Sequence, residues 1–184
     1  MKHHISILLT GGTIDSRFDI VQEAIVVNHK SGVKEFLDDL DLHITYDIKD
    51  ICLKDSRAIN NDDRMKLLNS IIQGESKYYL ITHGTYTMAE TAKFLEKHHD
   101  KIGDKTVVLV GSMKPLKEFV HSDAPFNLGF AIATLIASPP GIYLTMNGRA
   151  FHPENVSKNI EYGRFEALTQ EDPESISTRE SLAS

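Results

Sequence analysis

Short apolar runs alternate along this chain with longer amphipathic stretches, and this alternation is the feature that most constrains its fold. The runs rich in β-branched and other apolar residues predict five strands: Ile5–Leu9, His43–Ile48, Tyr78–Thr82, Thr106–Val110 and Gly141–Met146. Apolar residues at helical spacing predict four helices between them: Ser31–Leu40, Asn60–Gln73, Thr87–Lys97 and Pro125–Ala137. Strands that alternate with helices form right-handed βαβ units and build a parallel sheet covered on both faces. We therefore expect an α/β fold, a single three-layer α/β/α domain with a mostly parallel, Rossmann-like sheet.

Length and composition set the domain organisation. With 184 residues, of which 41% are apolar and 25% charged, the chain is long enough for one globular domain with a sizeable core. We expect residues 1–168 to form this domain. Residues 169–184, rich in Ser, Glu and Thr, are expected to form a mobile tail. The net charge of −6 disfavours a surface that follows phosphates, so nucleic acid is not expected as a partner.

Cysteine and histidine usage argues against disulfides, metals and cofactors. Cys52 is the only cysteine, so no internal disulfide can form, which fits a reducing compartment. The nine histidines include no pair at the spacing of HxxxH or HExxH, and we expect neither a metal nor a cofactor. The first apolar run is too short for a signal peptide or a membrane span. The sequence therefore predicts a cytoplasmic protein with no membrane partner.

Three loops follow predicted strands at the edge of the sheet where ligands bind in α/β proteins. They are Thr10–Thr13, His83–Thr87 and Gly111–Pro115. Two glycines after a buried strand let the backbone turn sharply and bring its N–H groups close to a ligand. A threonine hydroxyl there can attack a carbonyl while N–H groups stabilise the oxyanion that forms. Taken alone, a Gly-Gly loop of this kind is more often an ordinary turn, and either threonine-bearing loop by itself is weak evidence for a site.

Four segments in the same order and spacing give the chain its resemblance to a known family. Thr10–Ile14 (TGGTI) resembles the first signature of the L-asparaginase family, and Ile81–Met88 (ITHGTYTM) resembles the second. Val108–Pro115 (VLVGSMKP) and Ser122–Leu128 (SDAPFNL) fit the segments that follow in that family. The likeness extends from about residue 5 to about residue 166. It implies the asparaginase N-terminal fold and, in particular, the short single-domain branch that lacks the C-terminal domain.

The resemblance also implies a set of catalytic residues. Thr13 corresponds to the threonine that is acylated as nucleophile. Thr85 corresponds to the threonine of the second signature, which orients or activates water or takes part in proton transfer. Lys158 corresponds to the lysine that tunes that threonine, since a desolvated lysine can activate a weak hydroxyl. Without the resemblance, Lys158 would be read as a solvated surface residue.

The substrate-binding residues follow in the same way. Ser56 corresponds to the serine that grips the α-carboxylate of the substrate. Gly12 and Gly84 of the two signatures, together with Tyr86, complete the expected binding residues. The expected partner is a small amide resembling asparagine.

Two departures from the family bear on activity. The second signature of the family reads His-Gly-Thr-Asp-Thr, where this chain has Tyr86. The family's aspartate pairs with the α-ammonium group of the substrate, whereas a tyrosine carries no charge at pH 7 and is much larger. The lid that follows Thr13 supplies a tyrosine in many relatives, but residues 15–30 contain no tyrosine and only Phe18 as an aromatic.

Three functions remain open on this basis. The first, to which we commit, is an amidohydrolase that cleaves L-asparagine to aspartate and ammonia through an acyl-Thr13 intermediate. The second is a weak or inactive relative that binds a small carboxylate or serves as a scaffold. The third is an amidase for a substrate without a free α-amino group, for which a neutral Tyr86 is no handicap. A homodimer or higher homo-oligomer is also expected, formed in part by the helix at Pro125–Ala137, because a chain without the second domain exposes apolar surface.

Overall fold

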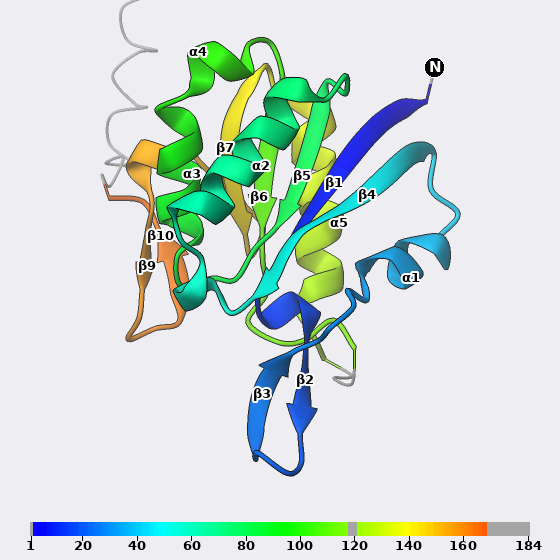
Figure 1. Ribbon diagram of the computed structural model, residues 1–184, viewed down its shortest axis with the longest axis vertical. Coiled ribbons are helices and arrows are strands. Elements are labelled where there is room, and N and C mark those ends of the chain that lie inside the picture. The colour runs from blue at the N-terminus through cyan, green and yellow to red at the C-terminus, as the bar shows by residue number, and fades with distance from the viewer. Residues whose placement is uncertain (1, 118–120, 169–184) are drawn as a thin grey trace, which may run out of the picture.

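A six-stranded, mostly parallel sheet forms the middle layer of the protein (Figure 1). The computed structural model describes residues 2–117 and 121–168. Neighbouring strands pair in parallel, except that β8 is antiparallel to β7. In sheet order the strands are β4 (Ile44–Lys54), β1 (His3–Gly11), β5 (Tyr78–Thr82), β6 (Thr106–Val110), β7 (Gly141–Met146) and β8 (Arg149–Phe151).

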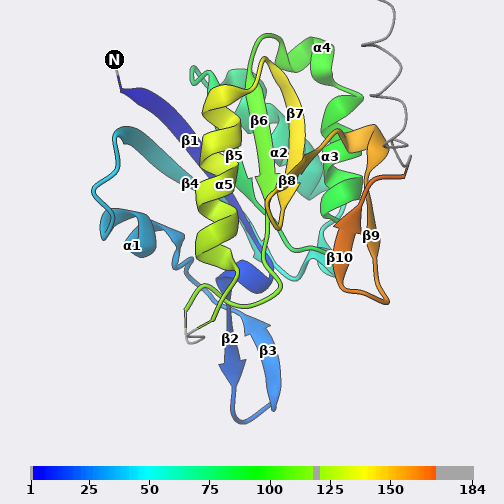
Figure 2. The ribbon, with the colours of Figure 1, turned by 180° about the vertical axis from the view of Figure 1, so that it is seen from behind.

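Helices cover both faces of this sheet and complete the three layers (Figures 1 and 2). On one face lie α1 (Val33–Asp38) and α5 (Ala124–Ala137), which pack on strand residues such as Ile7, Leu80 and Val108. On the other face lie α2 (Asn61–Gln73), α3 (Met88–Glu96) and α4 (His99–Ile102), which pack on the alternate strand residues. The predicted α/β fold with a mostly parallel sheet is confirmed.

The four predicted helices are present, and local chemistry sets their ends. Asn60 and Asp63 form a reciprocal capping box that starts α2, and Pro125 lies in the first turn of α5. Helix α1 is shorter than predicted. The Ser31 hydroxyl does accept a hydrogen bond from the Val33 N–H at 3.1 Å, as a capping serine would, but it also donates to the Asp15 carboxylate at 2.6 Å.

Strand β4 is longer than the sequence predicts. The prediction ends at Ile48, because the polar pair Lys49 and Asp50 breaks the alternation there. In the structure the pairing of β4 with β1 shifts register between Asp50 and Lys54, and the strand continues beyond that irregularity. Ile48 and Leu53 both pack with the α1/α5 core although they are five residues apart, a separation that places side chains on opposite faces of a regular strand, so the shift changes which residues face that core.

Several short elements lie outside the predicted pattern. The hairpin of β2 (Ser16–Asp19) and β3 (Ala24–Val27) projects from the carboxyl edge of the sheet (Figure 1), and β9 (Ser157–Asn159) pairs with β10 (Arg164–Glu166) beside α3. Three 3-10 helices are η1 (Thr13–Asp15), η2 (Ser56–Ala58) and η3 (Pro153–Asn155). The predicted tail at 169–184 lies outside the described residues. In the described part of the chain, no helix has the length and apolar character needed to cross a membrane.

Candidate active site

Three neighbouring strands deliver their loops to one point at the carboxyl edge of the sheet. Gly12 follows β1, Ser56 follows β4 and Gly84 follows β5. A Cβ atom built on Gly12 would lie 2.3 Å from the Gly84 Cα, and one built on Gly84 would lie 2.7 Å from the Ser56 Oγ. These backbones approach so closely that only glycine fits at positions 12 and 84. The contact brings together three residues that the sequence predicts as substrate-binding.

Thr13 lies at the start of η1, directly after this contact. Gly11 and Gly12 have φ angles of 91° and 86°, which turn the chain sharply out of β1. The Gly12 N–H donates to the Lys54 carbonyl at 2.9 Å, and the Gly12 carbonyl accepts the Ser16 hydroxyl, also at 2.9 Å. The turn is therefore anchored on both sides, and it presents a half-buried Thr13 next to the Gly84 loop.

Thr85 and Lys158 form a hydrogen-bonded pair from distant parts of the sequence. The Lys158 Nζ donates to the Thr85 Oγ1 at 2.8 Å, and Thr85 is only 3% exposed. Burial lowers the pKa of Lys158, and the nearby Arg57 guanidinium lowers it further. A lysine amine with a depressed pKa can exchange a proton with a hydroxyl more easily than an ordinary surface lysine. Thr85 and Lys158, which the sequence predicts as catalytic residues, are therefore in direct contact.

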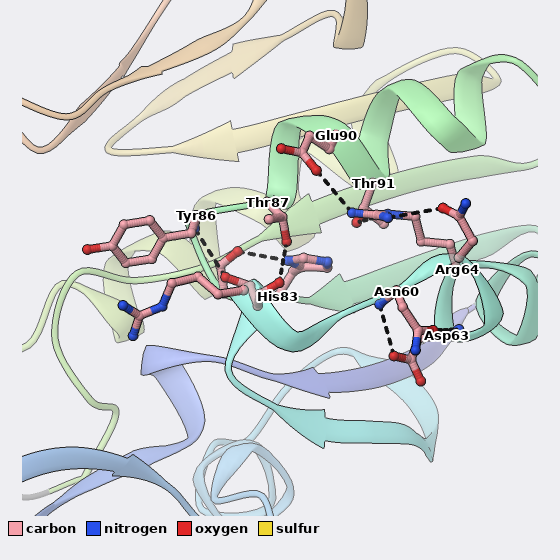
Figure 3. Close-up of polar contacts among 12 residues, drawn as sticks. Asn60, Asp63, Arg64, His83, Tyr86, Thr87, Glu90 and Thr91 are labelled. Atoms are coloured by element: carbon pink, nitrogen blue, oxygen red, sulfur yellow. Dashed lines mark hydrogen bonds and ion pairs between the residues drawn. The ribbon is translucent and has the colours of Figure 1, made fainter.

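Tyr86 contacts two cations. Its ring centroid lies 4.1 Å from the Lys158 Nζ and 4.8 Å from the Arg57 Cζ, which is cation–π distance in both cases. The side chain is 53% exposed and extends away from the helical end of the loop (Figure 3). Sequence reasoning did not assign a role to Arg57. Its position next to Ser56 is the one signal that could have drawn attention to it.

The Ser56 hydroxyl joins the second-signature loop to the loop after β4. Its Oγ accepts the Tyr86 N–H at 3.2 Å, and its carbonyl accepts the Thr87 hydroxyl at 2.7 Å. Because the Ser56 oxygen acts as an acceptor toward Tyr86, its own proton can be donated to another group. Ser56 is buried, so a carboxylate that reached it would be partly removed from water.

An arginine behind the site holds α2 against α3 and was missed by the sequence reasoning. Arg64 donates to the Thr91 hydroxyl and to the Glu90 carboxylate, each at 3.2 Å (Figure 3). The Arg64 side chain is 11% exposed, whereas that of Glu90 is 68% exposed. The contacts fix the first turn of α3 and, with it, the end of the loop that carries Thr85.

The histidine of that loop is buried and neutral. His83 is fully buried, and burial lowers its pKa to about 4. Its Nδ1 lies 2.8 Å from the Gly84 carbonyl, so a neutral ring donates its proton there. Its backbone N–H donates to the Val110 carbonyl at 2.8 Å. His83 thus ties the second-signature loop to β6.

The segment after Thr13, predicted as a lid, forms the β2–β3 hairpin. The buried Asp15 carboxylate holds its base by accepting the Ser31 hydroxyl at 2.6 Å and the Gly32 N–H at 3.1 Å. Burial raises the pKa of Asp15. Phe18, the lid aromatic singled out from the sequence, lies on β2 and is 48% exposed.

Fold and site together define an α/β protein with threonine hydroxyls, a lysine and a buried serine at the carboxyl edge of a parallel sheet. The chain belongs to the asparaginase family: the family model for the asparaginase N-terminal domain matches residues 4–179. It is 32% identical over 168 residues to L-asparaginase 2 of Escherichia coli (strain K12), an alignment that covers 84% of this chain and 46% of that protein.

Solved structures agree with this assignment. The thermostable L-asparaginase from Thermococcus kodakarensis matches with a TM-score of 0.77 and 27% identity, over 90% of this chain and 51% of that one. The probable cytoplasmic L-asparaginase from Campylobacter jejuni matches with a TM-score of 0.71 and 28% identity, over 90% and 52%. The chain thus spans about half the length of these relatives.

Proposed function

We propose that this protein is an L-asparaginase-type amidohydrolase that cleaves the side-chain amide of an asparagine-like substrate through an acyl-threonine intermediate. The observation that carries the proposal is the 2.8 Å hydrogen bond between Lys158 and the buried Thr85 hydroxyl, on a lysine whose pKa is lowered. The names of the relatives, which are L-asparaginases and glutaminase-asparaginases, support the same reaction class.

Thr13 is the nucleophile in this proposal. Its Oγ attacks the amide carbon, its proton passes to the leaving nitrogen, and ammonia departs as an acyl ester forms on Thr13. Water then adds to the ester carbon, returns a proton to the Thr13 Oγ and releases the free carboxylic acid. The backbone N–H of Thr13 is suited to stabilise the oxyanion in both steps, whereas the Gly12 N–H is engaged by the Lys54 carbonyl.

Thr85 and Lys158 act on the proton of the attacking group. The neutral Lys158 amine can accept the Thr85 proton across the same 2.8 Å contact, once the Thr85 hydroxyl donates to Nζ, as Thr85 takes a proton from water. Ser56 donates its hydroxyl proton to the carboxylate of the substrate. Gly12 and Gly84 bring the backbones of their two loops into direct contact beside it, since no side chain fits where these backbones meet. Tyr86 borders the same space.

The wider properties proposed for the protein follow from the family and the surface. We infer a small-molecule substrate, a cytoplasmic location and a homodimer or higher homo-oligomer that includes α5. Phe126 on α5 is 60% exposed and stacks on Phe130 at 6.5 Å between ring centroids. An apolar groove lined by residues such as Phe36, Leu40 and Ile132 runs between α1 and α5.

Ammonia release tests the reaction directly. The parent protein is expected to release ammonia from at least one asparagine-like amide, and Thr13→Ala and Thr85→Val should each reduce kcat by about a thousandfold or more. Thr134→Val is the matched control, because this hydroxyl donates to a carbonyl within α5 at 2.9 Å, away from the carboxyl-edge loops. Equal losses in all three variants would show that they report on folding, and full activity in Thr13→Ala would remove the proposed nucleophile.

One observation favours a second candidate, a carboxylate-binding protein without turnover. The Tyr86 ring stands beside Lys158 and Arg57, where it restricts access to the Lys158–Thr85 pair. Calorimetric titration with succinate or aspartate separates the two: tight binding without ammonia release from any amide would support the binding protein.

A further inference from the structure

Lys158 and Arg57 lie beside the ring of Tyr86, which borders the proposed substrate space. Their positive charge affects which ligands can bind there. We propose that this site selects ω-amides of small carboxylates that carry no α-ammonium group, in preference to L-asparagine. The inference rests on the proposed function for the reaction and deepens it by naming the substrate class.

Arg57 contributes a permanent positive charge, and Lys158 contributes a second one in its protonated form, before it loses the proton for the proposed catalytic step. Lys158 lies 4.1 Å and Arg57 4.8 Å from the centroid of the Tyr86 ring. The electrostatic field of Arg57 reaches Lys158, because it contributes to the lowered pKa of that amine. The two cations therefore act on the same small volume.

Asp55, which precedes Ser56 in the chain, is already engaged by Arg57. Asp55 accepts the Arg57 Nη2 at 2.8 Å, and it accepts the Arg57 Nε at 3.0 Å and the Arg57 backbone N–H at 2.8 Å. Within residues 2–117 and 121–168, Lys158 forms an ion pair with no carboxylate. An incoming ammonium group beside Lys158 therefore adds a further positive charge to the site.

The Tyr86 ring does not compensate for this deficit. A ring face can attract an ammonium group, but this ring already contacts two cations. The backbone at Tyr86 is fixed by its N–H bond to the Ser56 Oγ, so the side chain cannot leave without loss of that contact or a change of rotamer. A carboxylate, in contrast, gains from both cations and from the Ser56 hydroxyl.

Charge and geometry together define the substrate class. The molecule carries an amide for Thr13 to attack and a carboxylate that meets Ser56 and the two cations. The carbon next to the carboxylate bears hydrogen or an uncharged group instead of an ammonium. Succinamate, which is asparagine without the amino group, is the simplest probe of this class.

The test compares ammonia release from succinamate and from L-asparagine. For the parent protein, we expect kcat/KM for succinamate to exceed that for L-asparagine by about ten- to a hundredfold. Tyr86→Asp should reverse the order, because the new carboxylate pairs with the ammonium group of L-asparagine and repels the anionic succinamate. Tyr86→Phe, which keeps the ring beside both cations, should retain the parent's preference.

Tyr86→Asn separates charge from size, since it opens the same space as Tyr86→Asp without adding a negative charge. We expect the order to reverse in Tyr86→Asp and not in Tyr86→Asn. Equal gains for L-asparagine in both variants would show that bulk decides and would overturn the inference. A parent that cleaves L-asparagine as well as succinamate would overturn it too, while leaving the amidohydrolase proposal intact.

Binding measurements distinguish failure of the reaction from failure of the selectivity. Calorimetric titration of the parent with succinamate and with L-asparagine is run beside the ammonia assay. Tighter binding of succinamate without ammonia release from either would support the inference and refute the proposed reaction. Tighter binding of L-asparagine would refute the inference whatever the reaction does.

Discussion

At the scale of single residues, the pair formed by Lys158 and Thr85 gives the site a defined response to pH. The amine has to be neutral to accept the proton of Thr85. Burial and the charge of Arg57 both lower the pKa of Lys158, so the neutral form becomes populated at lower pH than for a free lysine, whose value is 10.5.

The pH profile of kcat/KM follows from this pair. Because the proposed mechanism uses the neutral amine, activity should rise with pH through the lowered pKa of Lys158. Arg57→Gln removes a positive charge that lowers this pKa, so the midpoint of the rise should move to higher pH. Rate measurements across pH 5–10 on both proteins check it. Arg149→Gln, which neutralises an exposed arginine on β8, serves as control and should leave the midpoint unchanged. A shift to lower pH in Arg57→Gln would contradict the assignment.

At the scale of elements, Gly12 and Gly103 have similar backbone angles but different surroundings. Comparing them distinguishes the cost of backbone strain from the cost of steric crowding at the site. Gly12 has φ 86° and ψ −172°, and Gly103 at the end of α4 has φ 72° and ψ −140°. A Cβ on Gly12 would lie 2.3 Å from the Gly84 Cα, whereas one on Gly103 would meet nothing within 4 Å.

Alanine at these two positions should therefore differ in cost. We expect Gly103→Ala to lower the free energy of unfolding by about 1–3 kcal/mol through backbone strain alone. Gly12→Ala should cost about 1–3 kcal/mol more, because the loops after β1 and β5 must separate. It should also abolish the ammonia release of the parent. Urea denaturation and the ammonia assay measure both effects. Equal costs at the two positions would mean that the loops yield freely.

The sequence predicts best the elements that are buried on one or both faces, because burial sets the spacing of their apolar residues. The central strands β5 and β6 and the helices α2, α3 and α5 fall close to their predicted bounds for this reason. Strand β4 was predicted too short, because its register shift after Asp50 breaks the alternation that marks a strand. The β2–β3 and β9–β10 hairpins are short and partly exposed, so they leave no periodic signal.

The candidate site divides in a similar way. Glycine-rich loops after buried strands pointed to Gly12, Thr13, Gly84 and Thr85 from the residues themselves. Lys158 came only from the family resemblance, since its partner is 73 residues away and no local pattern links them. Arg57 depends on the fold alone: its guanidinium reaches Tyr86 only because β4 and β5 end at the same edge.

At the scale of the whole molecule, the α5 face is where self-association is expected. Phe126 is 60% exposed on α5, and the same helix also borders the apolar groove shared with α1. Light scattering at micromolar concentration should give a mass above the 20.6 kDa of one chain. Phe126→Glu should lower that mass toward one chain, because it places a charge in the contact. Met65 is exposed on α2, which covers the opposite face of the sheet, so Met65→Glu should leave the mass unchanged. A monomeric parent protein would refute the expectation.

Strand β4 forms one edge of the sheet, and this position affects whether copies of the chain can aggregate through their sheets. An outermost strand of this length offers unpaired backbone groups along which a second molecule could add a strand. Exposed Asp47, Lys49 and Asp50 place alternating charges along that border, and the register shift bends the strand beyond them. Charged, bent borders of this kind protect a sheet from edge-to-edge aggregation. Neutralising all three residues should therefore raise the tendency of the protein to form fibrillar aggregates, even with the helical faces unchanged.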